Sequence, residues 1–286
     1  MRLIKMTGGL GNQMFIYALY IQMRKQFKNC RIDLSDMVHY NVHNGYEMWR
    51  VFDLPKSEFC IWQPLKKVIE FLFFRVILER HQKGSLRAYT QRINWPLVYF
   101  KGFYQSERYF KESEEEVRRS FTFNLKEASQ ASIKMASQMD EDVNAVSIHV
   151  RRGDYLDAKT WENCGCICQL PYYQKAIARM QQLVENPHFY VFSDDMAWVK
   201  ENLPLPNATY IDWNHGKDSW QDMMLMSHCR HNIICNSTFS WWGAWLNPNQ
   251  QKIVLMPNRW FVNDATPYIF PESWEKIEVI VPSSTK

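Results

Sequence analysis

The sequence lacks a long uncharged hydrophobic run. Its most apolar stretch, residues 68–78, contains Glu70 and Arg75 and is far shorter than the ~20 apolar residues that a membrane-spanning helix requires. Residues 1–6 lead directly into glycines, without the apolar region and cleavage site of a secretory signal. We therefore expect a cytoplasmic protein with a partly buried helix at residues 68–78. Peripheral membrane contact through residues 66–80 is the alternative.

The sequence also has little that favours a disulfide scaffold, a metal centre or a nucleic-acid binder. Its seven cysteines are odd in number and lack scaffold spacing, which predicts reduced thiols. Cys164, Cys166 and Cys168 stand two residues apart with no histidine nearby, unlike a zinc site. The net charge of +4 is too weak and dispersed for nucleic-acid binding.

Aromatic residues, in contrast, are abundant. The chain has 12 Trp, 14 Tyr and 17 Phe in 286 residues, more than a core alone needs, so some rings are expected to face a ligand. The length suits two domains that share a cleft. We place the boundary near residue 140, which gives an N-terminal domain of residues 1–140 and a C-terminal domain of residues 141–286.

The C-terminal half alternates strand and helix patterns, which predicts a doubly wound parallel sheet with ligands at the carboxyl ends of its strands. Expected strands are residues 145–150, 188–192, 209–211, 232–235 and 252–256, and expected helices are 171–185, 196–203, 219–229 and 240–246. In the N-terminal half we expect strands at 2–6, 31–34 and 97–104, a helix from residue 12, helices at 107–120 and 126–140, and helical and irregular structure at 56–95.

A glycine-rich loop follows the first expected strand. Residues 8–13 read Gly-Gly-Leu-Gly-Asn-Gln and offer backbone N–H groups to an anion at a helix N-terminus. The loop lacks the Lys-Ser/Thr of a P-loop, and Met14 stands where a dinucleotide fingerprint requires Gly or Ala. The alternative is a simple turn in which Asn12 caps the helix.

A histidine and two arginines follow the strand at 145–150. Residues 149–155 read His-Val-Arg-Arg-Gly-Asp-Tyr, and strand alternation places His149 and Arg151 on one face and Arg152 on the other. Arginine suits bidentate contact with a phosphate. The alternative is a surface arginine pair held by Asp154.

Two further strands end in polar residues. Asp194 and Asp195 follow residues 188–192 and could accept hydrogen bonds from guanine or ribose; a helix cap at Ser193 or Asp194 is the alternative. Residues 236–243 read Asn-Ser-Thr-Phe-Ser-Trp-Trp-Gly and form a second candidate anion cradle at a helix start. The alternative here is a capped helix with core tryptophans.

Together, residues 8–15, 149–155, 192–195 and 236–243 resemble the motif set of the α-1,2-fucosyltransferases of glycosyltransferase family 11. The resemblance extends over residues 3 to about 260. The segment at 149–155 is also similar to that of α-1,6- and protein O-fucosyltransferases, so it indicates GDP-fucose use more than linkage. The combination of residues 8–13 with 237–243 is more specific. The start of the chain at its first strand resembles bacterial members, whereas animal members carry a membrane anchor.

The resemblance implies a GT-B fold of the α/β class, in which two domains face each other across a cleft. The N-terminal domain presents the acceptor and the C-terminal Rossmann-like parallel sheet holds GDP-fucose. It also implies inverting transfer of L-fucose to the 2-hydroxyl of a galactose in a glycan or glycolipid, without a divalent cation or other cofactor. Fixed positive groups must then stabilise the leaving GDP.

Residue roles follow from the same resemblance. Arg151 is expected to contact the β-phosphate, and Arg152 is expected to brace the loop through Asp154. Asp154 is the nearby candidate base, although pairing with Arg152 would lower its pKa. The donor-binding set comprises Asn12, Gln13, His149, Arg152, Asp194, Asp195, Ser237, Thr238 and Phe239.

Three alternatives stay open from the sequence. The chain could be a fucosyltransferase of other linkage or a transferase for another GDP-sugar. It could be a non-catalytic glycan- or nucleotide-binding protein, although each phosphate-facing position of the motif set is intact. It could also be a membrane-surface scaffold that uses the segment at residues 66–80.

Overall fold

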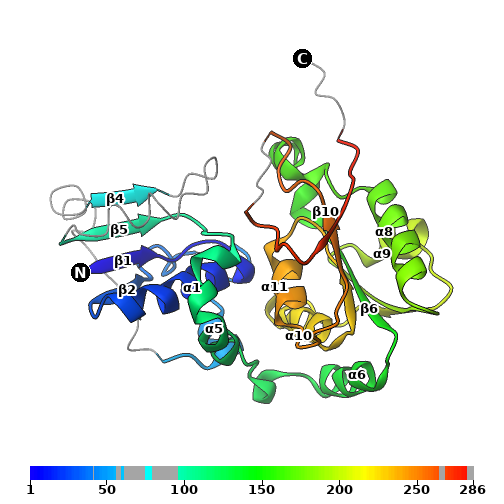
Figure 1. Ribbon diagram of the computed structural model, residues 1–286, viewed down its shortest axis with the longest axis horizontal. Helices are drawn as coiled ribbons and strands as arrows, with labels where there is room; N and C mark the ends of the chain where they lie inside the picture. The colour runs from blue at the N-terminus through cyan, green and yellow to red at the C-terminus, as the bar shows by residue number, and fades with distance from the viewer. Residues whose placement is uncertain (41, 56–58, 61–74, 79–95, 264–267, 282–286) are drawn as a thin grey trace. The chain divides into compact units, whose positions relative to one another are not determined.

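The computed structural model describes residues 1–40, 42–55, 59–60, 75–78, 96–263 and 268–281 (Figure 1). The chain divides into two compact units, residues 1–127 with 268–271 and residues 128–267 with 272–286. This division precedes residue 140, because helix α6 (Gln130–Glu141) packs against α10 (Trp220–His228) of the second unit.

The described strands of the first unit form a parallel sheet in the order β3-β2-β1-β5-β4. Helix α1 (Leu10–Gln26) follows β1, and nearly its whole length to Met23 is buried. The shorter helices are α2 (Met48–Phe52) and α5 (Glu114–Ser120). The strands are β1 (Arg2–Lys5), β2 (Cys30–Asp33), β3 (Phe59–Cys60), β4 (Arg75–Leu78) and β5 (Val98–Lys101).

The predicted helix at residues 68–78 is wrong for its last four residues. Arg75–Leu78 is strand β4, which pairs in parallel with β5. Val76 and Ile77 are β-branched and favour a strand once a partner is available. The rest of residues 66–80, on which the membrane-contact hypothesis rests, lies outside the described residues.

The described strands of the second unit form a parallel sheet in the order β11-β10-β9-β6-β7-β8. The chain runs outward from β6 to β8 and then returns to β9 on the other side of β6. This is a doubly wound topology, and its prediction from the sequence is confirmed. The strands are β6 (Ala145–Val150), β7 (His188–Ser193), β8 (Ala208–Ile211), β9 (His231–Ile233), β10 (Val254–Pro257) and β11 (Glu275–Ile277).

Helices connect these strands at nearly the predicted positions. They are α8 (Leu170–Leu183), α9 (Met196–Asn202), α10 and α11 (Thr238–Leu246). The three-residue helix α7 (Ala158–Thr160), between β6 and α8, was not predicted. Trp241 and Trp242 of α11 are fully buried, as the alternative of core tryptophans predicted. Strand β11 was not predicted.

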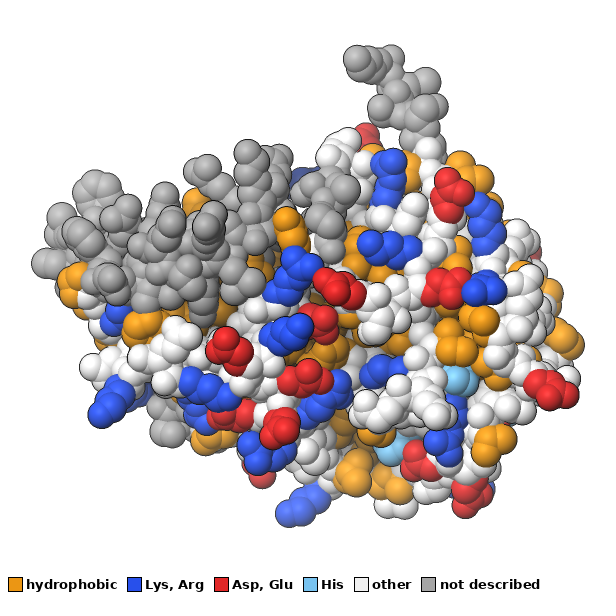
Figure 2. All heavy atoms as spheres, in the orientation of Figure 1, with side chains coloured by type: hydrophobic (Ala, Val, Ile, Leu, Met, Phe, Trp, Pro, Cys, Tyr) orange, Lys and Arg blue, Asp and Glu red, His pale blue; other side chains and the backbone are white. Residues whose placement is uncertain are grey.

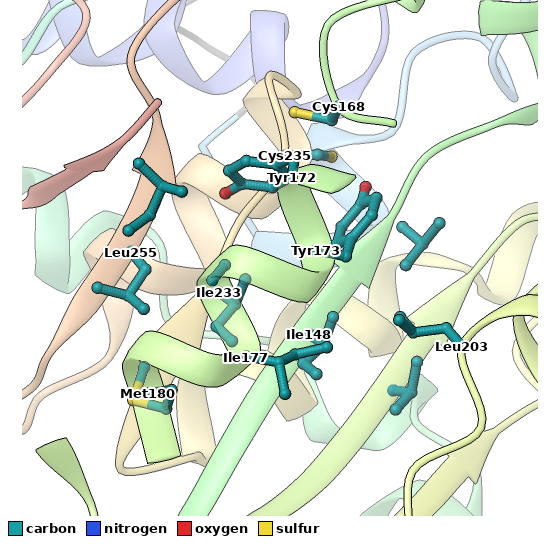
Figure 3. Close-up of a cluster of buried hydrophobic side chains, with 14 of the residues drawn as sticks. Ile148, Cys168, Tyr172, Tyr173, Ile177, Met180, Leu203, Ile233, Cys235 and Leu255 are labelled. Carbon is teal, nitrogen blue, oxygen red and sulfur yellow. The ribbon is translucent and has the colours of Figure 1, made fainter. Parts of the chain in front are cut away.

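The core of the second unit forms where α8 covers the sheet. All six residues of β6 are buried, and Figure 3 shows Ile148 of β6 among side chains of α8 and the neighbouring strands. The cluster includes Tyr172, Tyr173, Ile177, Met180, Ile233, Cys235 and Leu255. Close packing around β6 fixes the position from which the following loop starts.

The surface charge is mixed in sign. On the face drawn in Figure 2, basic and acidic side chains are interspersed over the described residues. Among those residues, no helix combines the length and apolar character needed to cross a bilayer.

Candidate functional site

Charged side chains meet at the carboxyl end of β6, where the strand order of the second sheet reverses. Because β6 lies between β7 and β9, the loops after these three strands share one edge of the sheet. This edge is the usual ligand position in doubly wound folds. The loop after β6 carries Arg151 and Arg152, and the loop after β7 carries Asp194 and Asp195.

Two carboxylates orient Arg151. Its Nε and Nη2 donate to Asp154 Oδ1 at 3.0 and 2.6 Å, and its Nη1 lies 3.0 Å from Asp194 Oδ2. Burial opposes the charged form of Arg151, but Asp194 and Asp154 outweigh this and raise its pKa above the ordinary value. A guanidinium has five N–H donors, so donors beyond these three contacts can reach an anion.

Arg152 points to a different partner from the one predicted. Its Nε donates to Asp195 Oδ2 at 3.0 Å, and its guanidinium lies 3.8 Å from the centre of the Trp198 ring. The predicted brace from Arg152 to Asp154 is therefore wrong. The short 3₁₀ segment Gly153–Leu156 places Asp154 one turn from Arg151, at spacing i,i+3, while strand alternation directs Arg152 toward α9.

The two aspartates after β7 are both engaged within the protein. Asp194 Oδ1 accepts from the Arg152 backbone N–H at 2.8 Å. Asp195 caps α9 by accepting from the Trp198 N–H at 3.2 Å, so the helix cap lies one or two residues after the predicted positions. Their contacts with guanine or ribose stay a prediction.

Gly153 allows the close approach of Asp194. A Cβ at Gly153 would lie 2.6 Å from Asp194 Oδ2, a distance that real side chains do not adopt. The residues next to Gly153 in the sequence do not indicate this role, because Asp194 is far away in the chain and comes close only in the fold.

His149 is a buried and neutral imidazole. Its exposed fraction is 5%, and burial, followed by the charge of Arg151, lowers its pKa to about 3. Nδ1 lies 3.3 Å from the sulfur of Cys235, and the ring lies 5.6 Å from that of Phe239. Cys235 was not among the predicted site residues.

A side chain from the same segment caps the N-terminus of α11. Ser237 is the N-cap, and its Oγ accepts from the Phe239 N–H at 3.3 Å; Thr238 is the first helical residue. The Tyr155 hydroxyl donates to the Asn236 carbonyl at 2.9 Å. This bond joins the loop after β6 to the loop after β9, beside the positive end of the α11 dipole.

The glycine loop belongs to the first unit. Helix α1 begins at Leu10 with Gly9 as its N-cap, so the alternative in which Asn12 caps the helix is wrong. Asn12 Oδ1 instead accepts from Gln105 Nε2 at 2.7 Å. Gly8 has φ +81°, and a Cβ there would lie 2.9 Å from the Asn12 side chain.

Gln13 joins this glycine loop to a second loop. Its side chain is fully buried; Nε2 donates to the carbonyls of Gly8 and Gly45 at 2.8 Å each, and Oε1 accepts from the Glu47 N–H at 3.1 Å. These contacts occupy the amide within the protein. Its predicted role in donor binding, like that of Asn12, stays a prediction.

The cysteine-rich loop contains buried free thiols. Cys164, Cys166 and Cys168 are all unbonded, and burial raises the pKa of Cys164 to about 11. Across the described part of the chain, no three His, Cys, Asp or Glu side chains are grouped to hold a metal ion.

Comparison with known proteins identifies the family of the chain. The model of Glycosyl transferase family 11 matches residues 3–278. An Escherichia coli alpha-1,2-colitosyltransferase is 33% identical over 294 residues, covering 96% of this chain and 98% of the relative. The E. coli O-antigen biosynthesis glycosyltransferase WbnK is 28% identical over 296 residues, covering 94% and 98%.

A solved structure shares the fold at low sequence identity. The structure of an Arabidopsis thaliana FUT1 mutant in complex with GDP aligns with a TM-score of 0.51 and 11% identity. The alignment covers 89% of this chain and 70% of that one.

Proposed function

The chain belongs to glycosyltransferase family 11 and is a glycosyltransferase of GT-B-like fold; from this premise we propose that it moves L-fucose from GDP-fucose to the 2-hydroxyl of a galactose residue. The transfer inverts the anomeric configuration and gives an α-1,2 linkage. The acceptor is a galactose-terminated oligosaccharide or glycolipid.

The observation that carries the proposal is the fixed guanidinium of Arg151 at the carboxyl end of β6. When the bond between fucose and GDP breaks, negative charge grows on the β-phosphate. Arg151 is permanently cationic, and Asp154 and Asp194 hold it in one orientation before the donor binds. Such preorganised charge stabilises a transition state without reorganisation. We propose that it takes the place of a divalent cation.

Asp154 acts on Arg151 in this proposal. Asp154 Oδ1 accepts two hydrogen bonds from the Arg151 guanidinium, so we assign Asp154 to orienting Arg151. The proton of the acceptor hydroxyl then passes to the departing diphosphate or to water. His149, Asp194 and the start of α11 are assigned to the nucleotide.

A second candidate donor follows from the colitosyltransferase relative at 33% identity. Colitose is L-fucose without its 3-hydroxyl, and the diphosphate contacts proposed for Arg151 are the same for both sugars. Transfer of colitose from a GDP-linked donor is therefore the competing function, and a direct comparison of donors separates the two.

The test measures transfer of labelled sugar from GDP-fucose, and in parallel from GDP-colitose, to lactose in excess EDTA. We expect an α-1,2-linked fucosyl product by NMR, a loss of at least about 100-fold in Arg151→Ala, and little change in Arg179→Ala. Arg179 is the matched control because it also pairs with a carboxylate, Glu275, on the surface of the same unit.

The other outcomes are equally decisive. Preference for GDP-colitose would establish the second candidate. GDP binding in calorimetry without transfer to any galactoside would favour a non-catalytic nucleotide-binding protein. Failure of GDP to bind would contradict the proposal, and loss of activity in EDTA that Mg²⁺ restores would contradict metal independence.

A further inference from the structure

We propose that Cys235 sets the tautomer of His149: its thiol donates a hydrogen bond to Nδ1, so that Nε2 carries the ring proton and serves as a hydrogen-bond donor to the nucleotide. Cys235 is a positioning residue in this inference, since it acts through His149. The assignment of the nucleotide as the recipient rests on the proposed function, whereas the tautomer itself does not.

The contact is fixed by the sheet. His149 lies in β6, Cys235 lies just after β9, and these strands pair in parallel with Ile148 opposite Ile233. Cys235 is fully buried, and its sulfur lies 3.3 Å from His149 Nδ1. The Phe239 ring lies 5.6 Å from the imidazole ring at an angle of 37°. Dense packing of this kind restricts reorientation of the imidazole.

The direction of the hydrogen bond follows from the acceptors near the sulfur. The backbone N–H of Arg151 also contacts the sulfur but is itself a donor, and a second candidate acceptor is Ser240 Oγ, at 3.6 Å. Its hydroxyl proton has two carbonyl acceptors, Ser237 at 3.2 Å and Cys235 at 3.4 Å. The imidazole nitrogen is both the nearer and the stronger acceptor for the S–H group.

Both partners keep the required protonation state. Burial raises the pKa of Cys235 to about 12, so the thiol retains its proton. Burial and the Arg151 charge keep His149 neutral. A neutral imidazole has one N–H and one acceptor nitrogen, and the hydrogen bond at one nitrogen selects the state of the other.

As a consequence, the Nε2–H group of His149 is a hydrogen-bond donor and selects acceptor atoms on the ligand. Within the described part of the chain, the side chain of His149 has no hydrogen bond besides that with Cys235. An Nε2–H group matches guanine O6 or N7 or a ribose or phosphate oxygen. With the opposite tautomer, Nε2 would repel these same atoms.

The first measurement is the ¹⁵N NMR spectrum of the imidazole in the full chain without ligand, with the His149 signals assigned by their loss in His149→Gln. We expect Nε2 at the position of a protonated nitrogen and Nδ1 at that of an unprotonated one. In Cys235→Ala, both signals should move toward an average of the two tautomers. A protonated Nδ1 in the wild-type chain would overturn the inference.

The second measurement is GDP affinity by calorimetry. Loss of one hydrogen bond that orients a donor predicts about 10-fold weaker binding in Cys235→Ala. Cys235→Ser should stay within about 3-fold of wild type, because its hydroxyl can also donate to Nδ1. Cys229→Ala is the control, since Cys229 is likewise a buried thiol but donates to the Leu225 carbonyl of α10.

The outcomes separate the two proposals. If wild type does not bind GDP, the proposed function fails while the NMR result still decides the tautomer. If wild type binds GDP with Nδ1 protonated, or if Cys235→Ser binds as weakly as Cys235→Ala, the inference fails and the proposed function stands. Because Cys235→Ser preserves the size of the side chain, it keeps the test valid if Cys235→Ala does not fold.

Discussion

Arg151 and Arg152 are adjacent in the chain, yet their surroundings give them different tasks. Arg151 lies between Asp154 and Asp194 at the sheet edge, and its contacts with them use three of the five N–H groups of the guanidinium. Arg152 is enclosed by Asp195 and the Trp198 ring. We therefore propose that Arg151 contacts the phosphate, whereas Arg152 anchors the loop on α9.

Asp154→Asn tests whether this carboxylate orients Arg151 or acts as a base. If it orients Arg151, we expect kcat to fall about 10-fold with an unchanged pH profile, because Asp194 still holds the guanidinium. A general base contributes about 10²–10⁴-fold. A loss in that range, together with a change in the pH dependence of kcat, would identify Asp154 as the base.

Gly153→Ala tests the approach of Asp194 to the loop. The added methyl group would displace the Asp194 carboxylate and with it one support of Arg151, so we expect kcat/KM to fall about 10- to 100-fold. The melting temperature should change little, because residue 153 is exposed.

Gly216→Ala is the control variant. An added Cβ at Gly216 would meet no atom within 4 Å, but the φ of +56° at this residue predicts a loss of about 1 kcal/mol in stability. Equal activity losses in both variants would contradict the expectation.

At the scale of elements, helices α10 and α11 pack closely through a glycine. A Cβ on Gly243 would lie 2.9 Å from the Cβ of Met226, which is near the backbone and cannot swing away. This close contact holds α11, and therefore its N-terminus at Ser237, against the rest of the second unit.

Gly243→Ala should lower the free energy of unfolding by about 1–3 kcal/mol, despite the better helix propensity of alanine. Urea denaturation measures the change. Met226→Ala leaves its Cβ in place, but it shortens the side chain whose Sδ and Cε also lie near the added methyl group. In a double-mutant cycle the two substitutions should therefore be non-additive; strict additivity would contradict direct contact as the cause.

At the scale of the whole molecule, a buried carboxyl group links stability to pH. Glu47 is 4% exposed and accepts from Arg50 Nη2 at 2.9 Å. Burial is the larger influence and raises its pKa from 4.5 to about 7, against the opposing charge of Arg50. The folded chain thus binds this proton more tightly than the unfolded chain does.

Stability should therefore fall as pH rises from about 4.5 to about 7 and then level off, by about 3 kcal/mol in total for this group. Glu47→Gln, which resembles the protonated form, should match wild type near pH 5 and exceed it in urea midpoint near pH 8. The exposed Glu115→Gln variant is the control. If wild type and Glu47→Gln keep the same difference at both pH values, the ionisation of Glu47 does not contribute.

The order of elements and much of the candidate site could be predicted from local sequence. The alternation of strand and helix patterns in residues 145–256 was sufficient for the second sheet, because hydrophobic periodicity reports burial of each element separately. The polar residues after β6, β7 and β9 were found for the same reason. Strand β4 and the short strands β3 and β11 were missed, since they acquire their conformation from pairing with β5, β2 and β10, respectively.

The sequence alone thus determined the family, the doubly wound sheet and the chemical types available at its edge. Only the tertiary structure decided which groups become partners. Arg152 pairs with Asp195, Gly153 makes room for Asp194, and Cys235 reaches His149 across 86 residues. Local propensity depends on near neighbours in the chain, whereas hydrogen bonds depend on positions in space that the packing of the whole sheet sets.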